Sequence, residues 1–300
     1  MYKFINTPDI CCIGHITHDK VITPKFEAHM PGGTAFYFAK ALSKFEDKSF
    51  ELITAVGEDN KKVIEELKEE GIDVTVLPSK NSVFFENKYE ENMSDRSQRV
   101  LAKADPFTVE KLLNVNSKVF HLGTLLSDDF SFEVLKFLSQ RGIVSIDIQG
   151  YLREVVGDKV IPVDYEIKRE ALPYIHILKA NEREMEVLTG KSDPFEAAQI
   201  LADWGGKEIL LTLGENGSVI YADGKYYEIP AIPAKEVIDT TGCGDTYMAG
   251  YLYKRVNGSS YSEAGKFAAA MCTMKLEGKG PFNGTPNDVN NLLKKHSLLN

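Results

Sequence analysis

Residues 239–246 read Asp239-Thr240-Thr241-Gly242-Cys243-Gly244-Asp245-Thr246, and a helix-like segment begins directly after the glycines. The small residues let several backbone N–H groups turn toward one point, which the positive end of the helix dipole also faces. The loop is therefore predicted to bind an anion. Asp245 would place a carboxylate at its edge, which is unfavourable unless that carboxylate accepts a proton from a nucleophile attacking the anion. The pattern indicates phosphoryl transfer to an alcohol, while a glycine-rich helix cap with an acidic first turn would look similar.

Strand-like and helix-like segments alternate along the rest of the chain. The expected strands are residues 9–16, 50–56, 119–122, 143–148, 175–178, 208–212, 218–222 and 225–229. One helix is expected after Gly33, and others at residues 60–70, 131–141, 181–188, 244–257, 261–275 and 287–295. This alternation predicts an α/β fold in a single domain, residues 1–300, with a mainly parallel sheet flanked by helices. Asp223-Gly224 is predicted to turn a hairpin.

Two segments, residues 20–30 and 82–102, interrupt this alternation. Both are extended and polar, and neither fits a helix that crosses between parallel strands. They form either a small sheet of their own or a pair of surface hairpins.

The composition narrows the class of protein. The chain has 300 residues and a formal charge of −9, with acidic and basic residues interleaved. This charge pattern argues against a nucleic-acid surface and against a basic membrane patch. We expect a cytoplasmic protein, because no segment resembles a signal peptide or a membrane span. The four cysteines lack the spacing of a zinc site, so reduced and separate thiols are expected.

The run from Asp239 to Tyr247 resembles a signature of the ribokinase, or PfkB-type, family of carbohydrate kinases, Asp-Thr-x-Gly-Ala-Gly-Asp-x-Phe. Cys243 stands at the usual Ala and Tyr247 at the usual Phe, and the resemblance extends over nearly the whole chain. It implies a ribokinase-like fold in which residues 20–30 and 82–102 form a β-sheet lid. It also implies transfer of the γ-phosphate of ATP to a hydroxyl of a sugar or cyclitol. Asp245 would be the general base, and the N–H groups of Gly242, Cys243 and Gly244 would stabilise the phosphoryl charge.

An acceptor-binding half is implied by Gly14-His15-Ile16-Thr17-His18-Asp19 followed by Gly32-Gly33. A carboxylate just past a strand can accept two hydrogen bonds from neighbouring hydroxyls, and a Gly-Gly pair at a helix start lets a substrate approach the backbone. Asp19, Gly32 and Gly33 are thus candidate substrate residues, although a turn residue and a helix cap would look the same. Tyr37 stands where the family pattern has Asn, so we expect its ring to pack against the C–H face of the acceptor.

Residues 147–153, with Gln149 and Arg153 as candidate acceptor contacts, look like the inositol-kinase branch of the family, as does Asp95-Arg96 in the lid. The best guess for the acceptor is therefore myo-inositol. A nucleoside or keto-sugar acid kinase, or a ligand sensor that has lost catalysis, are the alternatives.

The donor half is implied by two further motifs. Asn181 and Glu184 resemble the family's Asn-x-x-Glu motif and would organise Mg²⁺ through water, although a helix capping box has the same spacing. Thr212, Gly214 and Gly217 resemble its nucleotide loop, although Gly217 also precedes the predicted hairpin.

Two more expectations concern the same half of the molecule, and a third concerns the lid. Asp239 and Thr241 resemble positions that hold a monovalent cation such as K⁺. A place among anion-binding N–H groups would lower the pKa of Cys243. Lid strands pair between subunits in some relatives, which makes a homodimer plausible.

Overall fold

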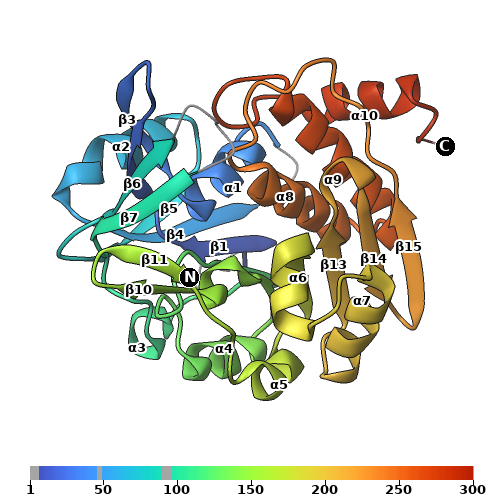
Figure 1. Cartoon of the computed structure of the whole chain (residues 1–300), viewed down its shortest axis with the longest axis horizontal. Coiled ribbons are helices and arrows are strands. Elements are labelled where there is room, and N and C mark those ends of the chain that lie inside the picture. Colours follow the sequence, from blue (N-terminus) through green and yellow to red (C-terminus); the bar gives the residue numbers. More distant parts are fainter. Residues whose placement is uncertain (1–6, 46–48, 90–95, 300) are drawn as a thin grey trace, which may run out of the picture.

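The computed structural model describes residues 7–45, 49–89 and 96–299, whose strands form two sheets (Figure 1). The larger sheet has nine strands in the order β15-β14-β13-β12-β9-β8-β1-β4-β5. Its parallel strands are β1 (Ile10–Gly14), β4 (Phe50–Val56), β5 (Asp73–Pro78), β8 (Val119–Gly123), β9 (Ile143–Asp147), β12 (Ile177–Asn181) and β13 (Glu208–Thr212). The expected mainly parallel sheet is confirmed.

An antiparallel hairpin of β14 (Ser218–Ala222) and β15 (Lys225–Ile229) closes one edge of this sheet. Asp223 and Gly224 both have positive φ, of 50° and 72°, as a two-residue hairpin turn requires. The turn predicted from these two residues is therefore confirmed.

Helices cover both faces of the larger sheet. One apolar cluster lies under α1 (Thr34–Leu42), α2 (Lys61–Glu69), α8 (Cys243–Val256), α9 (Tyr261–Leu276) and α10 (Pro286–Lys295). A second lies under α3 (Val109–Leu112), α4 (Phe132–Ser139), α5 (Lys168–Ala171), α6 (Glu182–Thr189) and α7 (Pro194–Asp203). The sequence interpretation did not include α7. Strand β1 is buried along its whole length, with Cys12 in the first cluster and Cys11 in the second, as period-two alternation dictates.

The smaller sheet, here called the lid sheet, has the order β10-β11-β7-β6-β2-β3. Four of its strands come from the two irregular segments: β2 (Thr17–Ile22), β3 (Glu27–Gly32), β6 (Val83–Tyr89) and β7 (Arg96–Ala102). The hairpin of β10 (Arg153–Val156) and β11 (Lys159–Pro162) completes it and was not predicted. Strands of four residues carry too short an alternation to be recognised without their partners.

Candidate active site

The carboxyl ends of β9 and β12 lie beside the start of α8, where the 239–246 loop enters the helix: Asp147 ends β9, Lys179 lies on β12, and both side chains reach within 4 Å of a Cβ added at Gly244. Gly242 is the N-cap residue of α8 and has a φ of 77°, which side chains other than glycine rarely adopt. A Cβ added there would lie 2.3 Å from Cδ1 of Tyr37 on α1. The glycine is therefore required both for the turn and for close packing of α1 against the loop.

Asp245 lies in the first turn of α8, and its side chain is partly buried. Burial raises its pKa to about 7, and the nearby charge of Asp147 adds to the rise. Lys179 and a hydrogen bond from Thr34 act in the opposite direction. A carboxylate with a pKa near neutrality suits a general base, because it accepts a proton readily and still exists in its ionised form at neutral pH.

Lys179 is a member of this site that the sequence interpretation missed. Its Nζ lies 2.8 Å from Oδ2 of Asp147, and both side chains are buried. A Cβ added at Gly244 would lie 2.9 Å from the same nitrogen, so the ammonium group is close to the backbone of the first turn of α8. Although burial opposes charge on Lys179, Asp147 and Glu184 outweigh it and raise its pKa above the usual value. The available signal was a lysine inside the apolar strand β12, because lysines are almost never fully buried unless paired.

Asn181 and Glu184 form the capping box that was considered as their alternative role. The Asn181 side chain accepts a hydrogen bond from the Glu184 N–H, and Glu184 Oε2 accepts one from the Asn181 N–H. Burial raises the pKa of Glu184 although Lys179 opposes this. The hard carboxylate and amide oxygens gathered here are of the kind that binds Mg²⁺, an ion that keeps several of its waters. The donor set therefore fits the predicted role, and the capping box does not exclude it.

The predicted acceptor residues Asp19, Gly32 and Gly33 lie together where β2 and β3 meet α1. Thr17 donates a hydrogen bond of 2.6 Å to Oδ1 of Asp19, and a Cβ added at Gly32 would lie 2.5 Å from Oδ2. Gly33 has a φ of 88° and is the N-cap residue of α1. This cluster sits on the lid sheet, so substrate contacts there would depend on the position of the lid.

Gln149 lies in a short 3₁₀ turn, Ile148–Leu152, that follows β9, and Arg153 begins β10 directly after this turn. The Gln149 N–H donates a hydrogen bond to Oδ1 of Asp147. The charge of Arg153 lowers the pKa of both Asp245 and Glu184, which places its guanidinium near these carboxyl groups. This turn therefore connects the candidate site to the β10–β11 hairpin of the lid sheet.

The predicted donor loop lies at the end of β13. Gly214 and Gly217 both have positive φ, and the Leu213 N–H donates to the carbonyl of Gly217, which makes a compact turn. Thr212 ends β13 and Gly217 directly precedes β14, so the hairpin alternative for Gly217 is confirmed. A cavity of about 400 Å³ lies between this loop and the first turn of α6, lined by residues that include Arg183 and Asn216.

Two expectations need correction, and a contact at Asp239 bears on a third. Burial raises the pKa of Cys243 to about 11, so the expected lowering was wrong. The Tyr37 side chain is 6% exposed and covers Gly242, so its ring serves mainly as packing for the loop. The Lys275 ammonium contacts Asp239, at the expected monovalent-cation position. Asp95 and the side chain of Arg96 lie outside the described residues.

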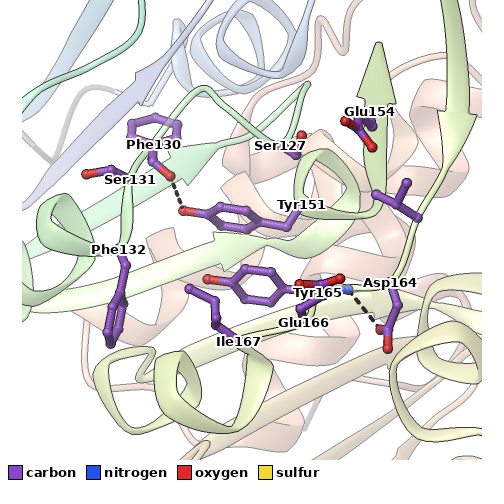
Figure 2. A pocket seen from close by; sticks show the side chains of 11 residues that line it. Ser127, Phe130, Ser131, Phe132, Tyr151, Glu154, Asp164, Tyr165, Glu166 and Ile167 are labelled. Carbon is purple, nitrogen blue, oxygen red and sulfur yellow. Dashed lines mark hydrogen bonds between the residues drawn. The ribbon is translucent and has the colours of Figure 1, made fainter. Parts of the chain in front are cut away.

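A larger cavity, of about 630 Å³, lies beside the turn that carries Gln149 (Figure 2). Tyr151 and Tyr165 stack in it with ring centroids 4.5 Å apart, and the Tyr151 hydroxyl donates to the carbonyl of Phe130. Among the residues that the structure describes, none of those lining it is a predicted site residue. The chemistry therefore points to the start of α8 rather than to this cavity.

The chain is similar to known kinases along most of its length. Residues 7–288 match the model of the pfkB family of carbohydrate kinases. A cytidine kinase of Thermococcus kodakarensis is 31% identical over 258 residues, which make up 81% of this chain and 87% of that protein. A solved pyrophosphate-dependent kinase in the ribokinase family has a TM-score of 0.85 at 29% identity, covering 94% of this chain and 99% of its own.

A second solved structure adds information about ligands. It is a pyrophosphate-dependent kinase in the ribokinase family, complexed with a pyrophosphate analog and myo-inositol. Its TM-score is 0.84 at 28% identity, covering 94% of this chain and 99% of its own. These similarities confirm the expected ribokinase-like fold.

Proposed function

The chain belongs to the pfkB family of carbohydrate kinases, and on that premise we propose that it transfers the γ-phosphate of ATP to a hydroxyl of myo-inositol. The observation that carries this proposal is the position of Asp245. Its partly buried carboxyl group, with a pKa of about 7, lies in the first turn of α8 beside Lys179 and the glycines of the loop. A base, a cation and backbone donors thus meet at one point.

The proposed step is an in-line displacement at phosphorus. Asp245 takes the proton of the acceptor hydroxyl, whose oxygen forms a bond to the γ-phosphorus while the bond from that phosphorus to the bridging oxygen of ADP breaks. The N–H groups of Gly242 and Gly244 and the ammonium of Lys179 stabilise the negative charge on the transferring group. The third expected donor, the Cys243 N–H, donates to the Thr240 carbonyl oxygen 3.3 Å away. Mg²⁺, held through water by Asn181 and Glu184, would neutralise charge on the donor phosphates.

Two observations support the choice of myo-inositol. The solved relative that binds it matches nearly the whole chain. Asp19 lies on β2, whereas Gln149 and Arg153 come from the segment that follows β9, so the two segments could contact hydroxyls on different sides of a compact ring. A nucleoside is the second candidate acceptor, because the cytidine kinase relative is 31% identical to this chain.

The donor is proposed to be ATP because apolar surface lies beside the predicted phosphate site. Val237 and Ile238, directly before the 239–246 loop, are 61% and 47% exposed. A purine base could cover these side chains and remove them from water. Pyrophosphate is the second candidate donor, supported by the pyrophosphate-dependent relatives.

The test is a product assay in which each donor is combined with each acceptor. We expect the highest specificity constant for ATP with myo-inositol, measured against ribose, fructose, adenosine and cytidine. Higher activity with cytidine would favour the nucleoside kinase, and turnover with pyrophosphate alone would replace ATP as the donor. No transfer to any of these acceptors from either donor would contradict the proposed substrate class.

A further inference from the structure

Lys275, in the last turn of α9, reaches the start of the anion-binding loop. Its Nζ lies 2.8 Å from the carbonyl oxygen of Asp239 and 3.1 Å from Oδ2 of the same residue. The side chain is 0% exposed. A fully buried ammonium group requires oxygen partners, because its lost hydration must be replaced. Asp239 provides two such oxygens from a single residue.

These oxygens are the kind of ligand that a buried K⁺ ion uses. Potassium is held by carbonyl oxygens that replace its hydration shell, and an ammonium group is a compact cation that binds the same acceptors through three N–H donors. Asp239 has further partners, since Oδ1 accepts a hydrogen bond from the Thr241 N–H and Oδ2 accepts one from Gly280. The residues therefore do not fit a K⁺ ion at Asp239 while Lys275 holds these oxygens.

The contacts around Lys275 join two elements. The Ile238 N–H donates a hydrogen bond of 2.8 Å to the carbonyl of Leu276, next to the lysine on α9. The negative end of the α9 dipole also favours a cation in this last turn. Residues 238 and 239 are thus attached to the end of α9. They lie four and three residues before Gly242, which caps α8.

We propose that the ammonium of Lys275 takes the place of a bound monovalent cation and positions the anion-binding loop without one. Lys275 is a positioning residue in this proposal, because it acts through Asp239 and touches no reacting atom. Turnover of this chain is therefore independent of K⁺.

The first experiment compares the wild-type chain in potassium, sodium and choline chloride at equal ionic strength. Both the initial rate of phosphoryl transfer and the midpoint of thermal unfolding should be the same in the three salts. The unfolding measurement needs no substrate, so it tests this inference even if the proposed acceptor is wrong. Activation or stabilisation of the wild-type chain by K⁺ over Na⁺ would overturn the proposal.

The second experiment removes the ammonium in two ways. Lys275→Ala leaves space beside Asp239, so its rate and unfolding midpoint should fall in choline and be partly restored by K⁺. Lys275→Met fills the space without a charge, so it should lose rate by about tenfold or more with no response to K⁺. Lys266→Ala, on the same helix, controls for loss of a positive charge.

A purely structural lysine would not give this contrast between the two variants. An equal response of the Ala and Met variants to K⁺, including no response by either, contradicts the proposal. If Lys275→Ala does not fold in any of the salts, its failure to be rescued also counts against a cation-replacing role.

Discussion

Asp245 and Lys179 illustrate, at the scale of single residues, how burial sets the chemistry of the candidate site. Burial alone would keep the Asp245 carboxyl protonated and would disfavour the Lys179 ammonium. The two groups lie in one buried cluster with Asp147 and Glu184, so their charges offset each other. The cluster therefore keeps the pKa of the Asp245 carboxyl group near neutrality and holds the charged Lys179 ammonium beside it.

Asp245→Asn is expected to lose about 10²-fold or more in turnover, because the amide cannot accept the proton of the acceptor hydroxyl. Binding of the acceptor should change far less. Steady-state kinetics with the verified substrate measure the first effect, and calorimetric binding to the folded variant measures the second. Near-normal turnover in a folded variant would show that Asp245 is not the base.

The same carboxyl group predicts a pH dependence of stability. Its pKa is raised from 3.8 in the unfolded chain to about 7 in the fold, so its favourable contribution is present below pH 3.8 and is lost as the pH rises toward 7. The amide of Asp245→Asn stays uncharged at every pH, so the variant does not lose stability by burying a charge as the pH rises. The variant should therefore unfold at a higher temperature than the wild type at pH 8, and the difference should be smaller at pH 5. A difference independent of pH would contradict the raised pKa.

Lys179→Met is expected to destabilise the fold by about 3 kcal/mol, because it leaves Asp147 buried without its ammonium partner. Adding Asp147→Asn to this variant should recover part of the loss, since the uncompensated charge is then removed. Urea unfolding of the wild type, both single variants and the double variant measures the coupling. Strictly additive losses would mean that the pair does not interact energetically.

At the scale of elements, the candidate site depends on the contact between α1 and the start of α8. Tyr37 on α1 lies against Gly242, and this contact depends on the missing Cβ of the glycine. The start of α8 and its loop N–H groups are therefore held at the sheet edge by packing against the Tyr37 ring, since Gly242 has no side chain that could cap the helix.

Gly242→Ala should reduce both stability and turnover, because a methyl group must adopt a positive φ and also displace the Tyr37 ring. Gly190→Ala is the matched control, since Gly190 has a φ of 71° and no atom within 4 Å of an added Cβ. The control should cost only the backbone strain, of about 1 kcal/mol, and leave turnover unchanged. Equal effects of the two variants on turnover would remove the role assigned to the Tyr37 contact.

At the scale of the whole molecule, the lid sheet leaves apolar side chains uncovered. Phe26 and Val156 are 54% and 56% exposed and lie near opposite edges of this sheet. None of the helices in the described parts of the chain has the length and apolar character to cross a bilayer. Exposed apolar patches on a protein often mark an interface with another protein.

We predict a homodimer whose interface includes these exposed apolar side chains of the lid sheet. Light scattering coupled to gel filtration should give twice the chain mass for the wild type, and Phe26→Asp with Val156→Asp should shift the mass toward that of a monomer. Leu113→Asp, which changes an exposed leucine at the end of α3, is the control. A monomeric wild type at all accessible concentrations would contradict the prediction.

Local patterns in the sequence were sufficient for the alternating fold, the hairpin at Asp223-Gly224 and the loop that ends at Asp245. Each of these depends on neighbouring residues: the period of apolar side chains, the positive φ of glycine, or backbone donors at a helix start. Asp19, Gly32 and Gly33 were predicted as acceptor residues only through the family resemblance, because a turn residue and a helix cap give the same local pattern.

Tertiary structure alone decided which charged groups surround that loop. Lys179 meets Asp147 because β9 and β12 are neighbours in the sheet, and Lys275 meets Asp239 because α9 ends beside the loop. The corrected pKa of Cys243 has the same origin, since burial by distant segments outweighs the local helix start. Burial and charge pairing act between segments that are far apart in the sequence, so no local pattern records them.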